Sequence, residues 1–119
     1  MFDHLGLKVN DIETSVRFYT AALAPLSYVL CSGDASGAGF GPPGEPALWL
    51  SKHAKAPGGA HVAFRARDRA SVDRFHAAGL AAGGRDNGAP GPRPDYGPKY
   101  YAAFLIDPDG NNVEAVCPR

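Results

Sequence analysis

Residues 4–23 have the sequence HLGLKVNDIETSVRFYTAAL, in which a short strand is followed directly by a helix. Apolar and polar residues alternate over 3–9, which predicts a half-buried strand. Asp11 has the side chain of a helix N-cap, because its carboxylate can accept from the first free N–H groups of a helix. Apolar residues then recur at helical spacing until Pro25 ends the helix. The stretch predicts one strand and one amphipathic helix that share a core.

The same order appears again in the second half of the chain. A predicted strand over 60–66 is followed by Asp68, a second N-cap, and by a helix that ends in the glycine-rich segment 79–84. Segment 88–98 is rich in proline and glycine and is predicted to be a loop. The other short strands are expected at residues 27–32, 37–41, 47–51, 85–87, 99–106 and 112–117.

This repetition predicts an α+β fold made of two βαβββ modules, at about 1–52 and 59–119. We expect the strands to form a cup-shaped mixed or antiparallel sheet with the helices on its outer face. The length of 119 residues suits a single domain.

Composition excludes several classes of partner. Twelve basic residues balance twelve acidic ones, so no global field attracts nucleic acid or an anionic membrane. The sequence shows neither a secretory signal nor an apolar stretch of membrane-spanning length, which predicts a cytoplasmic protein. Cys31 and Cys117 are interpreted as reduced structural thiols. A small molecule is the expected substrate or ligand.

Three residues that can bind metals lie on three predicted strands: His4, His61 and Glu114. Each alternates with larger apolar neighbours, so each is expected on the sheet face opposite the core. Two imidazoles and one carboxylate can hold a divalent cation and leave positions open for water or substrate. A single strand histidine is more often structural or solvent-facing. The matched placement in the two halves is what predicts a site for zinc, nickel, manganese or iron.

Three segments resemble vicinal oxygen chelate proteins. These are residues 4–23, GAHVAFRARD at 59–68 and FLIDPDGNNVEAV at 104–116. That superfamily includes glyoxalase I, extradiol dioxygenases, fosfomycin-resistance transferases, methylmalonyl-CoA epimerases and bleomycin-binding proteins. The resemblance implies a small single-domain member with metal ligands at His4, His61 and Glu114. It also implies a homodimer, with the three ligands either in one chain or divided between two.

One position departs from the glyoxalase I pattern. Trp49 stands on the fourth predicted strand, where the resemblance places a glutamate or glutamine. An indole N–H cannot ligate a metal, so the departure disfavours a four-ligand site. It leaves a His-His-Glu set like those of extradiol dioxygenases and fosfomycin-resistance proteins. Trp49 either lines the cup and contacts a flat ligand or fills the core.

Other residues are weaker candidates for ligand contact. One of Tyr100 and Tyr101 must face the cup, since neighbours alternate along a strand, and that side chain either binds substrate or packs. Arg93 lies in a long loop and either pairs with an anionic substrate group or is solvated. His53 and His76 match no ligand position and are interpreted as surface residues.

Two functions from different classes are compatible with this sequence. The first is a metal-dependent enzyme, a glyoxalase-like lyase or a ring-cleaving dioxygenase, in which the metal coordinates adjacent oxygens of the substrate and Glu114 is the catalytic candidate. The second is a protein that binds an antibiotic-like molecule without catalysis, as bleomycin-resistance proteins do. Fold membership does not decide between them.

Overall fold

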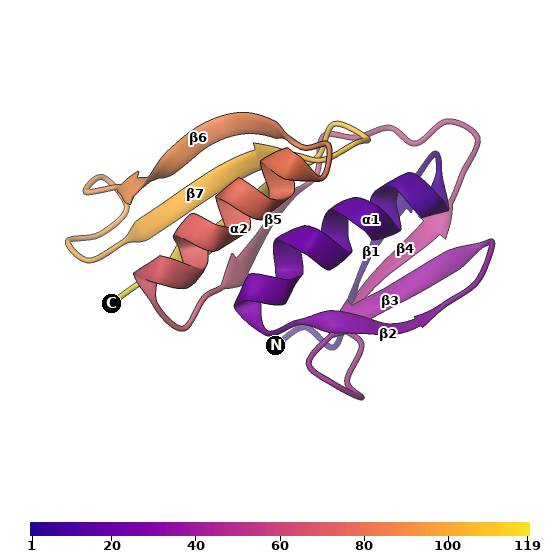
Figure 1. Ribbon diagram of the computed structural model, residues 1–119, viewed down its shortest axis with the longest axis horizontal. Coiled ribbons are helices and arrows are strands. Elements are labelled where there is room, and N and C mark those ends of the chain that lie inside the picture. Colours follow the sequence, from indigo (N-terminus) through magenta and orange to yellow (C-terminus); the bar gives the residue numbers. More distant parts are fainter.

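The first half of the chain forms a βαβββ module. The structure, a computed structural model, describes residues 1–119. The elements are β1 (Leu5–Val9), α1 (Ile12–Leu23), the 3-10 turn η1 (Ala24–Leu26), β2 (Val29–Gly33), β3 (Gly37–Gly41) and β4 (Leu48–Lys52). They form a sheet in the order β1-β4-β3-β2 (Figure 1), in which β1 is parallel to β4 and the other neighbours are antiparallel.

The second half repeats this arrangement. Its elements are β5 (His61–Arg65), α2 (Arg69–Ala81), β6 (Arg85–Pro92), β7 (Tyr101–Ile106) and β8 (Asn112–Cys117). The strand order is β5-β8-β7-β6, with β5 parallel to β8 and the other pairs antiparallel. The predicted α+β class and the two βαβββ units are therefore confirmed. Neither helix is both long and apolar enough to cross a membrane.

Both predicted helix starts are confirmed. Asp11 accepts from the N–H of Thr14 at 3.2 Å, and Asp68 accepts from the N–H of Ser71 at 2.7 Å. The hydroxyl of Ser71 also donates to Asp68, and the two contacts lower the pKa of this carboxyl. Pro25 lies in η1, directly after α1.

The extent of β6 differs from the prediction. The strand continues to Pro92 through residues that were expected to be a loop. It is an edge strand with a neighbour on one side only. Proline, which has no N–H to donate, is therefore tolerated there. The pairing with β7 shifts register on both sides of Gly88, which has φ of 152°. These bulges remove the regular alternation by which a strand is recognised in sequence.

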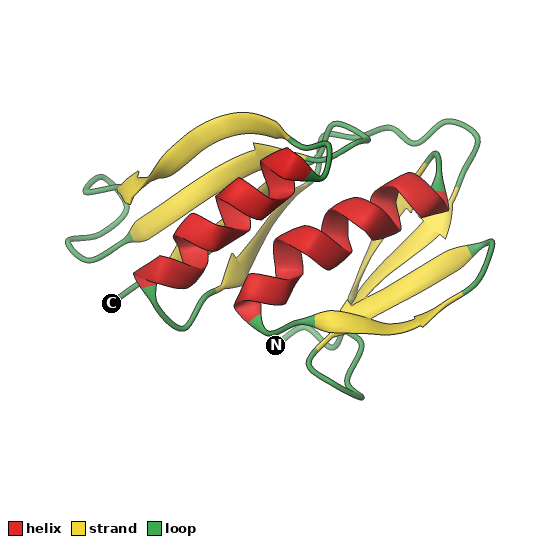
Figure 2. Cartoon of the chain, in the orientation of Figure 1, coloured by secondary structure: helices red, strands yellow, loops and turns green.

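The two helices cover one side of both sheets (Figure 2), and α1 packs against α2. No ladder joins β1 to β5, so the strands form two sheets and not one continuous sheet. Each sheet has one side against the helices and one side directed away from them, which we call the open face. The residues on the open face include Gly6, Gly39 and Trp49 in the first sheet and His61, Phe104 and Glu114 in the second.

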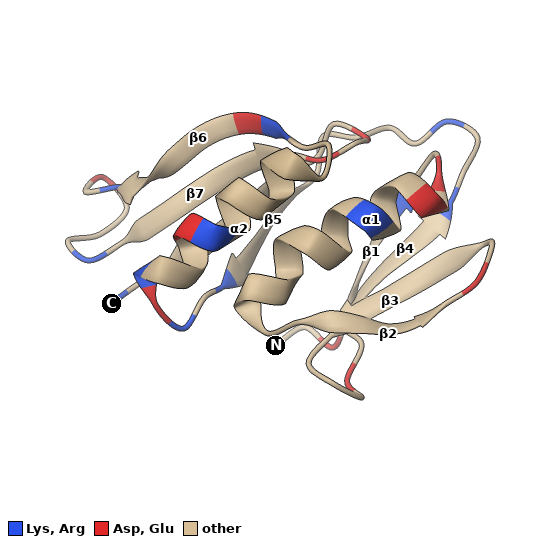
Figure 3. Ribbon diagram, viewed as in Figure 1, with Lys and Arg blue, Asp and Glu red and all other residues tan.

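One apolar core serves both halves. The side chains of both helices and the inward-facing strand residues belong to a single cluster. The rings of Phe18 and Tyr19 meet edge to face at 4.9 Å, and Tyr19 is completely buried. Acidic and basic residues are scattered over both halves of the chain (Figure 3), consistent with the balanced charge of the sequence.

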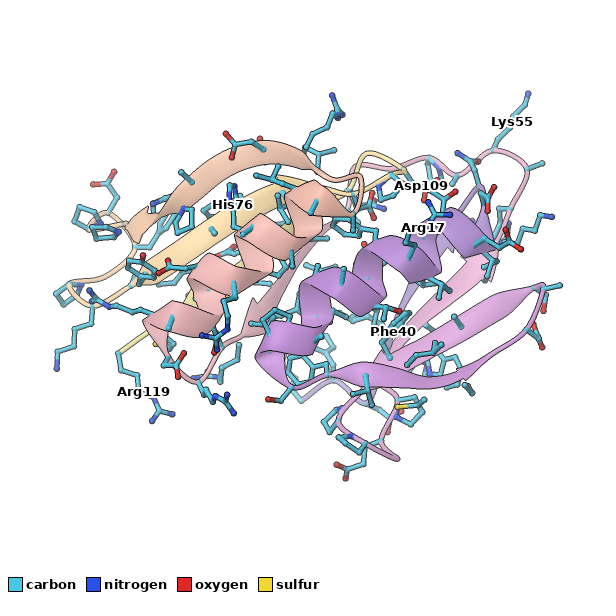
Figure 4. The ribbon with its side chains drawn as sticks, viewed as in Figure 1. Arg17, Phe40, Lys55, His76, Asp109 and Arg119 are labelled. Atoms are coloured by element: carbon cyan, nitrogen blue, oxygen red, sulfur yellow. The ribbon has the colours of Figure 1, made fainter.

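The turn between β7 and β8 is bonded to helix α1 of the other half. The Tyr19 hydroxyl donates to Asp107 at 2.5 Å, and Ser15 donates to Asp109 at 3.2 Å. Asp109 also accepts from the backbone N–H of Asn10 at 2.8 Å and lies beside the start of α1 (Figure 4). Burial, and then the charge of Asp107, raise the pKa of Tyr19. The DPDG segment thus orients one module against the other.

We expect Tyr19→Phe to reduce the free energy of unfolding by about 1–3 kcal/mol, because a buried carboxylate loses its phenol donor. Asp107 would keep the side-chain amide of Asn111, which donates to the same oxygen at 2.9 Å. Urea unfolding followed by circular dichroism measures the change. Tyr28→Phe is the matched control, because the Tyr28 hydroxyl donates only to an exposed backbone carbonyl. Equal effects of the two variants would contradict the role assigned to Asp107.

Candidate functional site

Two of the three predicted metal ligands are in direct contact. His61 begins β5 and Glu114 lies on the neighbouring strand β8, so both point to the open face. His61 Nε2 and Glu114 Oε1 are 2.9 Å apart. Two ligand atoms bound to one ion at about 2.1 Å stand about 3.0 Å apart at a right angle and about 3.4 Å apart at a tetrahedral angle. The separation therefore fits adjacent ligands of a divalent ion.

Glu114 is buried, and its second carboxylate oxygen, Oε2, also accepts a hydrogen bond. The Tyr100 hydroxyl donates to Glu114 Oε2 at 2.5 Å. Burial, this hydrogen bond and the charge of Glu114 raise the pKa of Tyr100 to about 12. The side chain of Glu114 is 3% exposed, whereas that of His61 is 54% exposed. The carboxylate is thus fixed by Tyr100 on one side, and the imidazole beside it is open to solvent.

His4 lies apart from this pair. It precedes β1, is exposed, and its Nδ1 is 2.7 Å from the carboxylate of Asp3. His4 borders a mostly apolar cavity of about 340 Å³ between the two halves, together with Tyr28, Phe64 and Arg65. Neither His61 nor Glu114 lines that cavity. Consistent with this separation, the chain contains no group of three His, Cys, Asp or Glu residues that could hold a metal ion.

Trp49 lies on the open face of the first sheet and is 38% exposed. A Cβ at Gly39 would lie 2.6 Å from its ring, so the indole lies directly against β3 where a glycine leaves room. Gly6 on the other neighbouring strand has open space above it. The indole is therefore partly exposed on the sheet surface and is not part of the buried core, and contact with a flat ligand stays a prediction.

The two neighbouring tyrosines contact opposite sides of the sheet, and only Tyr101 belongs to β7. Tyr100 reaches Glu114. Tyr101 lies on the helix side, where its hydroxyl donates to Asp73 at 2.6 Å and its ring is 4.9 Å from the guanidinium of Arg69. The structure therefore does not bring Tyr101 to the open face, and its contacts with α2 assign it to packing.

Arg93 lies at the open face, where its guanidinium contacts the ring of Phe104, a residue that the sequence analysis did not name. Phe104 pairs with Glu114 in the β7–β8 register, and its ring centre is 6.4 Å from that of His61. The guanidinium of Arg93 lies 5.4 Å from the centre of the Phe104 ring. Phe104 was missed because an aromatic residue in an apolar strand gives no sign of which face it occupies. No local pattern could have indicated it, because its position beside Glu114 depends on the register of β7 against β8.

Of the two histidines interpreted as surface residues, one is not. His53 is exposed. His76 is 9% exposed and its Nε2 is 2.9 Å from Asp86, so the surface prediction was wrong for this residue. The reason is that β6 passes beside α2 and supplies a carboxylate that compensates the buried imidazole.

A single chain therefore fits a metal ion only in part. His61 and Glu114 form a fixed pair of donors with suitable spacing, and Trp49 contributes none. A third protein donor is needed to complete the sets that are usual for catalytic divalent ions. Within one chain the structure does not supply it.

Residues 1–115 match the family model described as the Glyoxalase/Bleomycin resistance protein/Dioxygenase superfamily. The chain belongs to this superfamily. No curated protein matches the sequence. Membership confirms the resemblance carried by the three sequence segments, and it accounts for the two βαβββ units. One scaffold supports several functions, so membership identifies the superfamily and the fold.

Solved structures of the superfamily extend over the whole chain. A glyoxalase/bleomycin resistance protein from Albidiferax ferrireducens is 30% identical, with 100% of this chain and 99% of that chain covered and a TM-score of 0.86. A glyoxalase I mutant from Zea mays is 27% identical, with 97% and 45% covered and a TM-score of 0.73. A lactoylglutathione lyase from Agrobacterium tumefaciens, 24% identical over 98% and 91%, shares the fold with a TM-score of 0.67.

Proposed function

We propose that this protein is a divalent-metal-dependent enzyme, glyoxalase-like or dioxygenase-like, which binds adjacent oxygens of a small substrate. The contact between His61 and Glu114 at 2.9 Å, with Tyr100 holding the second carboxylate oxygen, is the observation that supports it. Burying a carboxylate costs free energy because its charge is taken out of water, so a buried carboxylate beside an accessible imidazole is a candidate functional site.

The third ligand in this proposal is His4 of a second copy of the chain. His4 is exposed at the start of an edge strand, and the open faces of both sheets have no helix over them. A symmetric dimer that places β1 of one copy beside β5 of the other would pair two free edges and bring His4 to the His61–Glu114 pair. Exposed Phe2 and Leu5 adjoin His4 and would be buried by such a contact.

The residues around the pair have separate roles. A bound divalent ion would supply Lewis-acid chemistry to oxygens of the substrate. Glu114 is the group placed to accept or return a proton, and Tyr100 orients it through the hydrogen bond to Oε2. Phe104 and Trp49 offer flat apolar surfaces for the remainder of the molecule. A cytoplasmic location remains a prediction.

The test is metal content measured by mass spectrometry after purification without chelator or affinity tag. We expect about one divalent ion per chain in the wild type and less than about a tenth of that in His61→Ala, since the site would lose one of three protein donors. His53→Ala is the matched control, because it removes an exposed histidine outside the site. A wild type that neither contains nor takes up a divalent ion, or a His61→Ala that retains it, would contradict the proposal.

A second candidate is a protein that binds an antibiotic-like molecule without catalysis. It is favoured by Trp49, whose indole lies half exposed over Gly39 with open space above Gly6, and by the lack of a third donor within one chain. Binding of metal-free bleomycin, detected as a change in Trp49 fluorescence that is independent of added metal, would support it. Turnover that depends strictly on metal would exclude it.

A further inference from the structure

Backbone carbonyls hold the guanidinium of Arg93 in one orientation. Nη2 donates to Ala89 at 2.7 Å, and Nη1 donates to Gly91 at 3.0 Å and to Pro92 at 3.3 Å. A Cβ at Gly88 or at Gly91 would lie 3.3 Å from a guanidinium nitrogen, so both glycines leave room for it. The side chain has therefore already lost most of the rotamer freedom that a ligand contact would cost.

The charge of Arg93 has no carboxylate partner. None of the ion pairs of the chain includes Arg93. The carbonyl oxygens that it contacts orient the guanidinium but carry no charge to neutralise it. Its Nε–H and one N–H of Nη2 have no acceptor in the protein. Neighbouring N–H groups of a guanidinium match the two oxygens of a carboxylate and bind it bidentately.

The guanidinium of Arg93 and the imidazole of His61 both lie near the ring of Phe104. The guanidinium lies 5.4 Å from the ring centre of Phe104, and that ring centre lies 6.4 Å from His61. Phe104 is also the direct strand neighbour of Glu114. A small molecule whose oxygens reach His61 and Glu114 would extend across Phe104 and place its far end at Arg93.

We propose that Arg93 binds a carboxylate of the substrate, and that the substrate is therefore a small organic acid which also carries adjacent oxygens. The proposal rests on the proposed function, because His61 and Glu114 set the other end of the molecule. Because the overall charge is balanced, the carboxylate is attracted by Arg93 itself and not by a positive field of the whole surface.

The test compares protocatechuate, a catechol with one carboxylate, with catechol itself. Both are titrated calorimetrically into zinc-loaded and into metal-free protein. We expect protocatechuate to bind the wild type at least about tenfold more tightly than catechol, from one charge-assisted bidentate contact. Arg93→Gln should bring the ratio of the two affinities close to one, and Arg93→Lys should keep part of it. Lys99→Gln, which removes an exposed positive charge from the same loop, should leave the ratio unchanged.

The two proposals fail in different ways in this experiment. The ratio between the two probes reports on Arg93, whereas the ratio between loaded and metal-free protein reports on the metal site. A wild-type probe ratio near one, an unchanged ratio in Arg93→Gln, or an equal loss in Lys99→Gln would each overturn the assignment of Arg93. Urea midpoints within experimental error of the wild type establish that the variants are folded.

Discussion

Mixing His4→Ala chains with Glu114→Ala chains is expected to restore metal binding that neither variant has alone. In a symmetric dimer with shared sites, each mixed dimer has one intact site and one site that lacks both ligands. Random mixing at equal concentrations should therefore recover about one quarter of the wild-type metal content. The measurement is metal content after the two variants are unfolded together, refolded and dialysed against a limited excess of zinc.

The same experiment separates the two arrangements that the sequence left open. If all three ligands came from one chain, every site in the mixture would lack one ligand and no metal would return. His4→Ala mixed with His61→Ala is a second complementing pair, because those ligands also come from different chains. Glu114→Ala mixed with His61→Ala is the matched control: both ligands lie in the same half of one chain, so this mixture should stay metal-free. Recovery in the control, or none in the complementing pairs, would contradict the shared site.

Asp107→Ala is expected to reduce the free energy of unfolding by about 3–5 kcal/mol, the largest effect on stability that we predict. The Asp107 carboxylate is 3% exposed and accepts four hydrogen bonds, from Tyr19, from the backbone N–H groups of Asp109 and Asn111, and from the side-chain amide of Asn111. Alanine would leave these buried donors without an acceptor. Urea denaturation and thermal unfolding both measure the loss.

Two variants bracket this prediction. Asp107→Asn keeps one acceptor oxygen and should cost about 1–3 kcal/mol. Asp109→Ala loses the contacts to Asn10 and Ser15, which are nearer the surface, and should cost no more than about 1–2 kcal/mol. A cost below about 1 kcal/mol for Asp107→Ala would mean that the turn can satisfy its donors otherwise.

The positions of the core elements could be predicted from the sequence because they depend on local patterns. Asp11 and Asp68 cap the helices as expected, and the last strand, 112–117, matches its prediction residue for residue. Strand parity also placed His61 and Glu114 on one face. The burial of His76 was not predicted, because it depends on β6. The prolines, glycines and two bulges of β6 remove the alternation by which a strand is recognised in sequence.

Contacts between strands and between halves could not be predicted in this way. Alternation predicts that Tyr100 and Tyr101 face opposite sides, but only the tertiary structure shows that Tyr100, which directly precedes β7, donates to Glu114. The pairing of β7 with β8 places Phe104 beside Glu114, and the end of β6 brings Arg93 to within 5.4 Å of the Phe104 ring centre. Such contacts depend on register across many residues, and a local pattern carries no information about register.

The sequence by itself determined the α+β class, the two βαβββ modules and the pair of strands that carry His61 and Glu114, because periodicity and capping are properties of neighbouring residues. Only the tertiary structure decided that the strands form two separate sheets, and that His4 lies apart from the other two candidate ligands. These outcomes depend on how the helices pack and on which strand edges remain unpaired. Packing α1 against α2 sets the relative position of the two halves, and no single segment of sequence encodes it.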